Sequence, residues 1–146
     1  MFRIAAKLLD SSDKARRRYD KAARAGVVAS SQYLLNEIKK AYSDYYTSGD
    51  FRSTLQIRQA WRRADPEKND HGWYTIVGVP TANVTPKGSK TPVDRGMVAL
   101  AWEMGHDNLF TGKRERVRIA VPTAQESARG MADAWARVVK RYMEAP

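Results

Sequence analysis

Residues 123–142 read TAQESARGMADAWARVVKRY and carry the clearest secondary-structure signal in the chain. Thr123 and Glu126 have the spacing of a capping box, which predicts a helix start. Apolar side chains then recur at helical intervals, so one face of this helix is apolar. These are Ala124, Ala128, Met131, Ala132, Trp135, Val138, Val139 and Tyr142. We therefore expect a long C-terminal helix that packs Trp135 and its neighbours on a sheet.

Three stretches before this helix alternate apolar and polar residues, the pattern of half-buried strands. They span residues 55–61, 73–79 and 117–121, the last with a basic face. Polar residues 65–70 connect the first two, which are expected to form an antiparallel pair. The sequence thus predicts an α+β fold with N-terminal helices, a small, mainly antiparallel sheet of three to four strands, and the long C-terminal helix packed on that sheet.

Residues 97–104 fit two patterns. Their apolar residues alternate as in a strand, at Val98, Leu100, Trp102 and Met104. Asp94, however, is a suitable N-cap, and Gly105 is a suitable residue just beyond the last helical turn. We favour a short buried helix for this stretch.

The preceding stretch, residues 80–95, contains three prolines and a glycine and shows no periodicity. Loops of this length inside a compact domain are usually functional or mobile. We therefore expect a long extended loop here, and in a protein that assembles such a loop is a natural docking element.

The N-terminal part of the chain is predicted to be helical. Residues 1–26 are charge-rich, and residues 27–45 carry the apolar stripe of an amphipathic helix that ends near Gly49. Gly26 either interrupts the helix or is tolerated within one longer helix. Residues 1–26 are read either as a solvated helix face or as a basic helical arm that binds a partner. The length of 146 residues fits a single domain over residues 1–146.

Positive charge is the main chemical signal. The chain has 26 Lys and Arg against 16 Asp and Glu, a net charge of +10. Such a charge attracts phosphates and acidic proteins. The basic residues are spread along the chain without a helix-turn-helix, zinc-finger or RNA-stacking motif, so sequence-specific readout is not expected. The candidate contacts with DNA in a channel, or with an acidic partner, are Arg16, Arg17, Arg18, Lys113, Arg114 and Arg116.

No motif of an enzyme, cofactor site or metal site is present. The absence of cysteine excludes thiol catalysis, disulfides and cysteine-ligated metals. The nucleophile elbow, the glycine-rich phosphate loops and the HExxH metal motif do not occur. His71 and His106 each adjoin an aspartate in predicted turns, and we assign both to the surface. We expect neither enzymatic activity nor a cofactor nor a membrane-spanning helix.

Three segments, taken in order, resemble one family. Residues 47–55 (TSGDFRSTL) resemble a TG-x-L-x-x-S-I entry into a sheet, and residues 101–105 (AWEMG) resemble an E-[FY]-G segment. Residues 117–124 (VRIAVPTA) resemble a P-F-x-R-P-A strand-to-helix junction. Together, between an N-terminal and a C-terminal helix, they are similar to the tail-completion or neck proteins (minor tail components) of long-tailed bacteriophages. The resemblance covers roughly residues 27–142.

The resemblance implies a structural role in the neck or tail end of the virion, which is assembled in the host cytoplasm. The protein would form a hexameric ring at the neck or tail end, completing the tail and joining it to the head connector. The implied partners are other copies of the chain, connector or stopper proteins, the tail tube or terminator protein, and DNA in the channel. The alternative is a non-specific DNA-binding protein that acts through basic surface patches. The candidate interface residues are Pro86, Lys87, Lys90, Trp102, Glu103 and Phe110.

Overall fold

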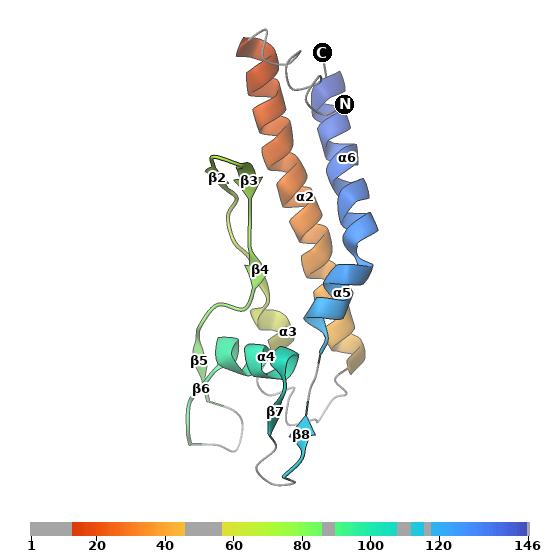
Figure 1. Ribbon diagram of the computed structural model, residues 1–146. Helices are drawn as coiled ribbons and strands as arrows, with labels where there is room; N and C mark the ends of the chain where they lie inside the picture. The colour runs from red at the N-terminus through yellow and green to blue at the C-terminus, as the bar shows by residue number, and fades with distance from the viewer. Residues whose placement is uncertain (1–12, 46–56, 86–89, 108–111, 116–117, 146) are drawn as a thin grey trace. The chain divides into compact units, whose positions relative to one another are not determined.

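The computed structural model describes residues 13–45, 57–85, 90–107, 112–115 and 118–145 (Figure 1). This part of the chain mixes helix and sheet, which confirms the predicted combination of the two. Its helices are α2 (Asp13–Tyr45), α3 (Ile57–Ala60), α4 (Arg95–Met104), α5 (Ala120–Glu126) and α6 (Ala128–Glu144). The long N-terminal and C-terminal helices were both predicted.

The strands form pairs, and in the described residues they do not form the single sheet of three to four strands that we predicted. All four pairs are antiparallel. They are β1 (Arg62–Arg63) with β4 (Val77–Gly78), β2 (Glu67–Asn69) with β3 (Gly72–Tyr74), β5 (Asn83–Val84) with β6 (Val93–Asp94), and β7 (His106–Asp107) with β8 (Arg114–Glu115). The β5–β6 pair lies within residues 80–95, so described residues near both ends of that stretch are paired with each other as two short strands.

The chain divides into two compact units. The first unit comprises the described parts of residues 1–33, 64–76 and 129–146, and the second those of residues 34–63 and 77–128. The chain therefore passes between the units four times, after residues 33, 63, 76 and 128. Helix α2 supplies residues to both units.

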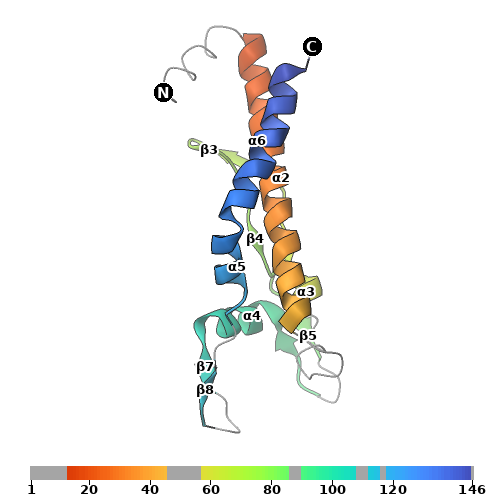
Figure 2. The same cartoon turned by 90° about the vertical axis from the view of Figure 1, so that its right-hand side faces the viewer.

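In the first unit, the N-terminal part of α2 runs antiparallel to α6 (Figures 1 and 2). Gly26 lies within one continuous helix, and a Cβ built at this residue would stand 2.5 Å from Trp135 Cδ1. On the other helix, Gly130 lies against the ring of Tyr33. The structure thus corrects the expected packing of Trp135, because its ring is seated on α2 and not on a sheet.

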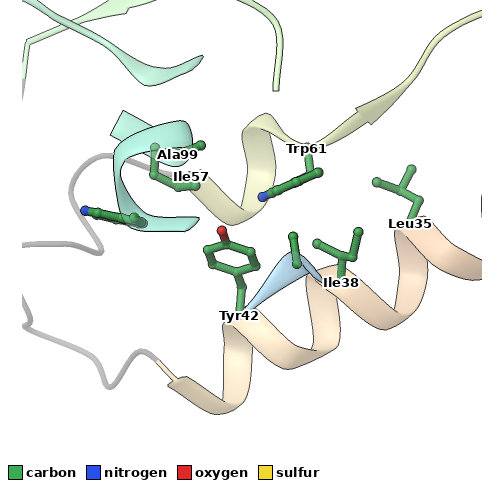
Figure 3. Close-up of a cluster of buried hydrophobic side chains, with 8 residues drawn as sticks. Leu35, Ile38, Tyr42, Ile57, Trp61 and Ala99 are labelled. Atoms are coloured by element: carbon green, nitrogen blue, oxygen red, sulfur yellow. The ribbon is translucent and has the colours of Figure 1, made fainter. Parts of the chain in front are cut away.

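The second unit has a core built around the C-terminal part of α2 (Figure 3). Tyr42 and Ile57 are fully buried, and the rings of Tyr42 and Trp61 lie 5.9 Å apart between centroids. The core comprises Leu35, Ile38, Tyr42, Ile57, Trp61, Ala99, Trp102 and Ala120. Of its α2 members, Ile38 and Tyr42 belong to the apolar stripe read from the sequence, whereas Leu35 takes the place expected for Leu34.

Residues 57–60 form the one-turn helix α3, so the predicted strand over 55–61 is wrong in its described part. Ile57 and Trp61 are four residues apart, a spacing that places both on one side of a helix as well as of a strand. Tertiary contacts decide between the two. Ile57 and Trp61 both enter the core, and Arg58 Nε donates a hydrogen bond of 2.9 Å to the backbone oxygen of Lys39.

The favoured helix at residues 97–104 is confirmed as α4, but it is not buried throughout, because Met97, Leu100 and Met104 are exposed. The Asp94 carboxylate accepts hydrogen bonds from the backbone N–H groups of Gly96 (2.8 Å) and Met97 (3.3 Å), as an N-cap does. Gly105 follows with a φ of 94°, and its N–H donates to Ala101 O at 2.8 Å. Both predicted caps are therefore in place.

The C-terminal helix differs from the prediction in its start and continuity. Helix α5 begins at Ala120, and α6 begins after Ser127, so the predicted single helix is divided. The capping box is not formed at Thr123, whose hydroxyl instead donates to Ile119 O at 2.7 Å. Residues 120–121 are helical, which also shows that the predicted strand 117–121 is wrong at that end.

Candidate functional site

The end of α4 and the start of α5 are joined by one carboxylate. Glu103 accepts hydrogen bonds from the backbone N–H groups of Ile119 (2.9 Å), Ala120 (2.7 Å) and Val121 (3.2 Å). The first N–H groups of a helix have no partner within that helix, and a negative charge also complements the helix dipole there. Glu103 thus supplies the cap for α5 that its own sequence does not. We call this arrangement the Glu103 joint.

Helix α4 has two apolar faces. Ala99 and Trp102 on one face are buried in the core of the second unit. The other face carries Met97, Leu100 and Met104, with exposed fractions of 62%, 50% and 65%. We call these three residues the α4 stripe.

The spacing of the α4 stripe, three and then four residues, places all of its side chains on one side of the helix. Single exposed apolar side chains are common on proteins, but a contiguous apolar patch marks an interaction surface. Val121, the third residue that the Glu103 joint holds, is also partly exposed (39%).

The candidate interface residues lie in different environments. Trp102 is only 5% exposed and serves the core, and the Glu103 carboxylate is engaged at the joint. Lys90 is exposed. Pro86, Lys87 and Phe110 lie outside the described residues.

Sequence reasoning did not single out Met97 and the rest of the α4 stripe. Read with a strand period, Leu100 and Met104 share a face with Trp102, whereas the helix period separates them from it. Had the helical pattern been applied to α4, residues 97, 100 and 104 would have emerged as one face.

The candidate basic contacts are divided between the two units. In the first unit, Arg16 and Arg17 are exposed and Arg18 is partly buried, all in the first turns of α2. In the second unit, Lys113 and Arg114 are exposed, and Arg114 forms a surface ion pair of 3.6 Å with Asp107. Arg116 lies outside the described residues.

Two of these arginines meet in a pocket of about 580 Å³. Its cationic residues are Lys14, Arg17, Arg18 and Lys21, and Tyr142 of α6 forms part of its wall. We call it the basic pocket. Four cations with Asp13 as the acidic lining residue give it a positive potential, which suits an anion.

The core beside the Glu103 joint has one strongly shifted titratable group. Burial of the Tyr42 hydroxyl raises its pKa to about 12, and the negative charge of Glu103 adds to the shift. The phenol therefore stays neutral far into the alkaline range, as a buried group requires.

Within the described ranges, no three or more His, Asp or Glu side chains gather into a group able to hold a metal ion. His71 lies in the turn between β2 and β3, where its backbone N–H donates to Asn69 Oδ1 at 2.9 Å. None of the described helices is long and apolar enough to cross a membrane. Comparisons with protein-family models, curated proteins and solved structures find no match to this chain.

Proposed function

We propose that this protein is a structural component of the neck or tail end of a long-tailed phage virion, where copies assemble into a ring through α4. The observation that carries the proposal is the α4 stripe. One face of α4 is fixed in the core by Trp102, so the opposite face presents Leu100 and its neighbours rigidly to a second subunit. In a ring the contact is heterologous, and the stripe meets a different face of the next copy.

The Glu103 joint supports this proposal. It connects residues 101–105 with residues 117–124, two of the three segments on which the resemblance to neck proteins rests. The two segments are far apart in sequence but form one structural feature. That feature holds the end of α4, and with it Met104 of the stripe.

The first experiment is electron microscopy of particles from a phage in which this gene is deleted. Separate full heads with unjoined tails are expected. Tails of normal length indicate a completion protein, whereas overlong tails indicate a terminator. Intact infectious virions would refute the proposal.

The α4 stripe is tested by complementing that deletion with Leu100→Asp. A charge on the stripe is expected to abolish head–tail joining while the purified protein keeps its circular dichroism spectrum. Ile76→Asp is the matched control, because Ile76 is an exposed apolar residue of the first unit (65%, against 50% for Leu100). Ile76→Asp is expected to restore joining, and equal defects in both variants would exclude the stripe as the interface.

The basic pocket favours non-specific DNA binding as a second candidate function. Such binding weakens steeply with salt, because each phosphate contact releases counterions. A mobility-shift titration across salt with duplex DNA tests it. The double variant Arg17→Ala and Arg18→Ala is expected to reduce the salt slope by about two if both residues contact phosphates. A neck subunit without this function binds duplex DNA poorly at physiological salt.

A further inference from the structure

A second pocket of the first unit combines aromatic and cationic side chains. It has a volume of about 430 Å³, within the range of small-ligand pockets. Its walls come from α2, from the β2–β3 hairpin and from α6. We call it the aromatic pocket. Its aromatic rings and basic side chains are those of Tyr19, Trp73, Trp135, Arg16, Lys68 and His71.

The rings are held in place by internal contacts. Asp20 of α2 accepts a hydrogen bond of 3.0 Å from Trp73 Nε1 and forms an ion pair with Lys68, which ties the hairpin to the helix. Trp135 is seated against Gly26, where the missing side chain leaves room for the indole. A site whose groups are already ordered loses less conformational entropy on binding.

The charge of the aromatic pocket selects against a cationic ligand. Aromatic cages for quaternary ammonium groups leave their ring faces open to the cation. Here, protein cations already stand over the Trp73 ring, with Arg24 Cζ at 5.6 Å and Lys68 Nζ at 5.7 Å from its centroid. The Asp20 carboxylate is already paired with Lys68, so the pocket keeps a net positive charge.

Two rings retain accessible surface for stacking. Tyr19 is 44% exposed and Trp135 is 36% exposed, and both line the pocket. A ligand that combines a flat ring with a negatively charged group can stack on these two side chains and pair with the cations of the pocket. Nucleobases stack on aromatic side chains, and their phosphates pair with arginine and lysine.

We infer that the aromatic pocket binds a nucleotide unit, its base stacked on Tyr19, the more exposed of the two rings, and its phosphate beside Arg16 or Lys68. The unit belongs either to single-stranded nucleic acid or to a free nucleotide, since the bases of a duplex are paired and stacked internally. This inference uses first-unit residues only and does not depend on the ring proposed above.

The test measures binding of the full chain to fluorescently labelled oligothymidylate by anisotropy. The competitors are an abasic oligomer of equal length and thymidine 5′-monophosphate. Stacking predicts that oligothymidylate binds about five-fold or more tightly than the abasic oligomer. Equal affinity would overturn the inference, because only the phosphates would then be recognised.

A pair of matched variants locates the binding. Tyr19→Leu is expected to reduce the affinity for oligothymidylate to that for the abasic oligomer. Tyr74→Leu changes a tyrosine of similar exposure (39%) in the same unit that does not line the aromatic pocket, and it is expected to leave the affinity within about two-fold. Loss of affinity in both variants, or in neither, would overturn the inference, and the abasic comparison tests it even if a variant does not fold.

The competitors also identify the source of the nucleotide. Competition by the monophosphate at the affinity of the oligomer assigns the pocket to free nucleotides, and weak competition assigns it to a strand. Leu100→Asp is expected to bind oligothymidylate as the unchanged chain does. A failure of ring assembly is thereby distinguished from a failure of nucleotide binding.

Discussion

Gly26 of α2 lies so close to Trp135 of α6 that a Cβ at residue 26 would stand 2.5 Å from Cδ1 and 2.6 Å from Nε1 of the indole. Glycine inside a helix costs roughly 0.5–1 kcal/mol relative to alanine. Here the cost is offset because the absence of a side chain at residue 26 lets the Trp135 indole pack directly against the backbone of α2. Gly130 of α6 and Tyr33 of α2 repeat the arrangement with the helices exchanged, because a Cβ at residue 130 would overlap the tyrosine ring.

Gly26→Ala is expected to lower the free energy of unfolding by about 1–3 kcal/mol, because the new methyl group overpacks the indole. In an unhindered helix the same change would be stabilising. Urea denaturation measures the difference. In a chain that already carries Trp135→Leu the loss should shrink, and an increase in stability without that second change would contradict the close contact.

Glu103→Ala is expected to destabilise the protein by about 1–3 kcal/mol, since three backbone N–H groups at the start of α5, two of them partly buried, lose their acceptor. Glu103→Gln keeps one oxygen and should cost less. Amide hydrogen exchange at Ile119, Ala120 and Val121 should accelerate in both. Glu126→Ala, an exposed change on α5, serves as the control, and equal acceleration there would argue against the joint.

Tyr42 makes the stability of the protein depend on alkaline pH. Its pKa in the folded state is raised to about 12, above the ordinary value near 10. Its contribution is therefore fully present below pH 10 and is lost as the pH rises from 10 to 12, by up to about 3 kcal/mol. Urea denaturation below pH 10 and near pH 12 measures this loss of unfolding free energy, which should be smaller in Tyr42→Phe than in the unchanged chain. An unchanged decline would show that other groups cause it.

Asp20 makes the stability of the protein depend on acidic pH, in the opposite direction to Tyr42. The hydrogen bond from Lys68, and then that from Trp73, lowers the pKa of this carboxyl group. Its contribution is present above the ordinary carboxyl pKa and is lost as the pH falls through the lowered value. The Trp73 indole N–H resonance should therefore shift on acidification.

Asp20→Asn should remove that acid-dependent shift of the Trp73 resonance, whereas Asp65→Asn on the nearby exposed loop should preserve it. A shift that persists in Asp20→Asn would show that another group holds the hairpin against α2.

The predictable parts of the fold were those whose signals are local. Asp94 and Gly105 mark α4 through caps that lie next to the helix, and the apolar residues recurring over 27–45 mark the C-terminal part of α2. The start of α5 was mispredicted because its cap, Glu103, comes from 16 to 18 residues away, while a local capping box offered a plausible substitute.

The candidate sites were less predictable for a similar reason. The α4 stripe appears only once the helical period replaces the strand period. The aromatic pocket collects Tyr19, Trp73 and Trp135 from three separate stretches of sequence, and their proximity is set by tertiary packing.

Because the chain passes between its two units four times, the two units receive their last residues at different stages of synthesis. A ribosome makes residues 34–63 and 77–128 before nearly all of α6, so the second unit has its full set of residues first. The first unit waits for Trp135, the ring that fits against Gly26, although α2 was made long before. Neither unit is one continuous stretch of the chain, so a truncation that removes part of one unit cannot leave the other as a separate continuous fragment.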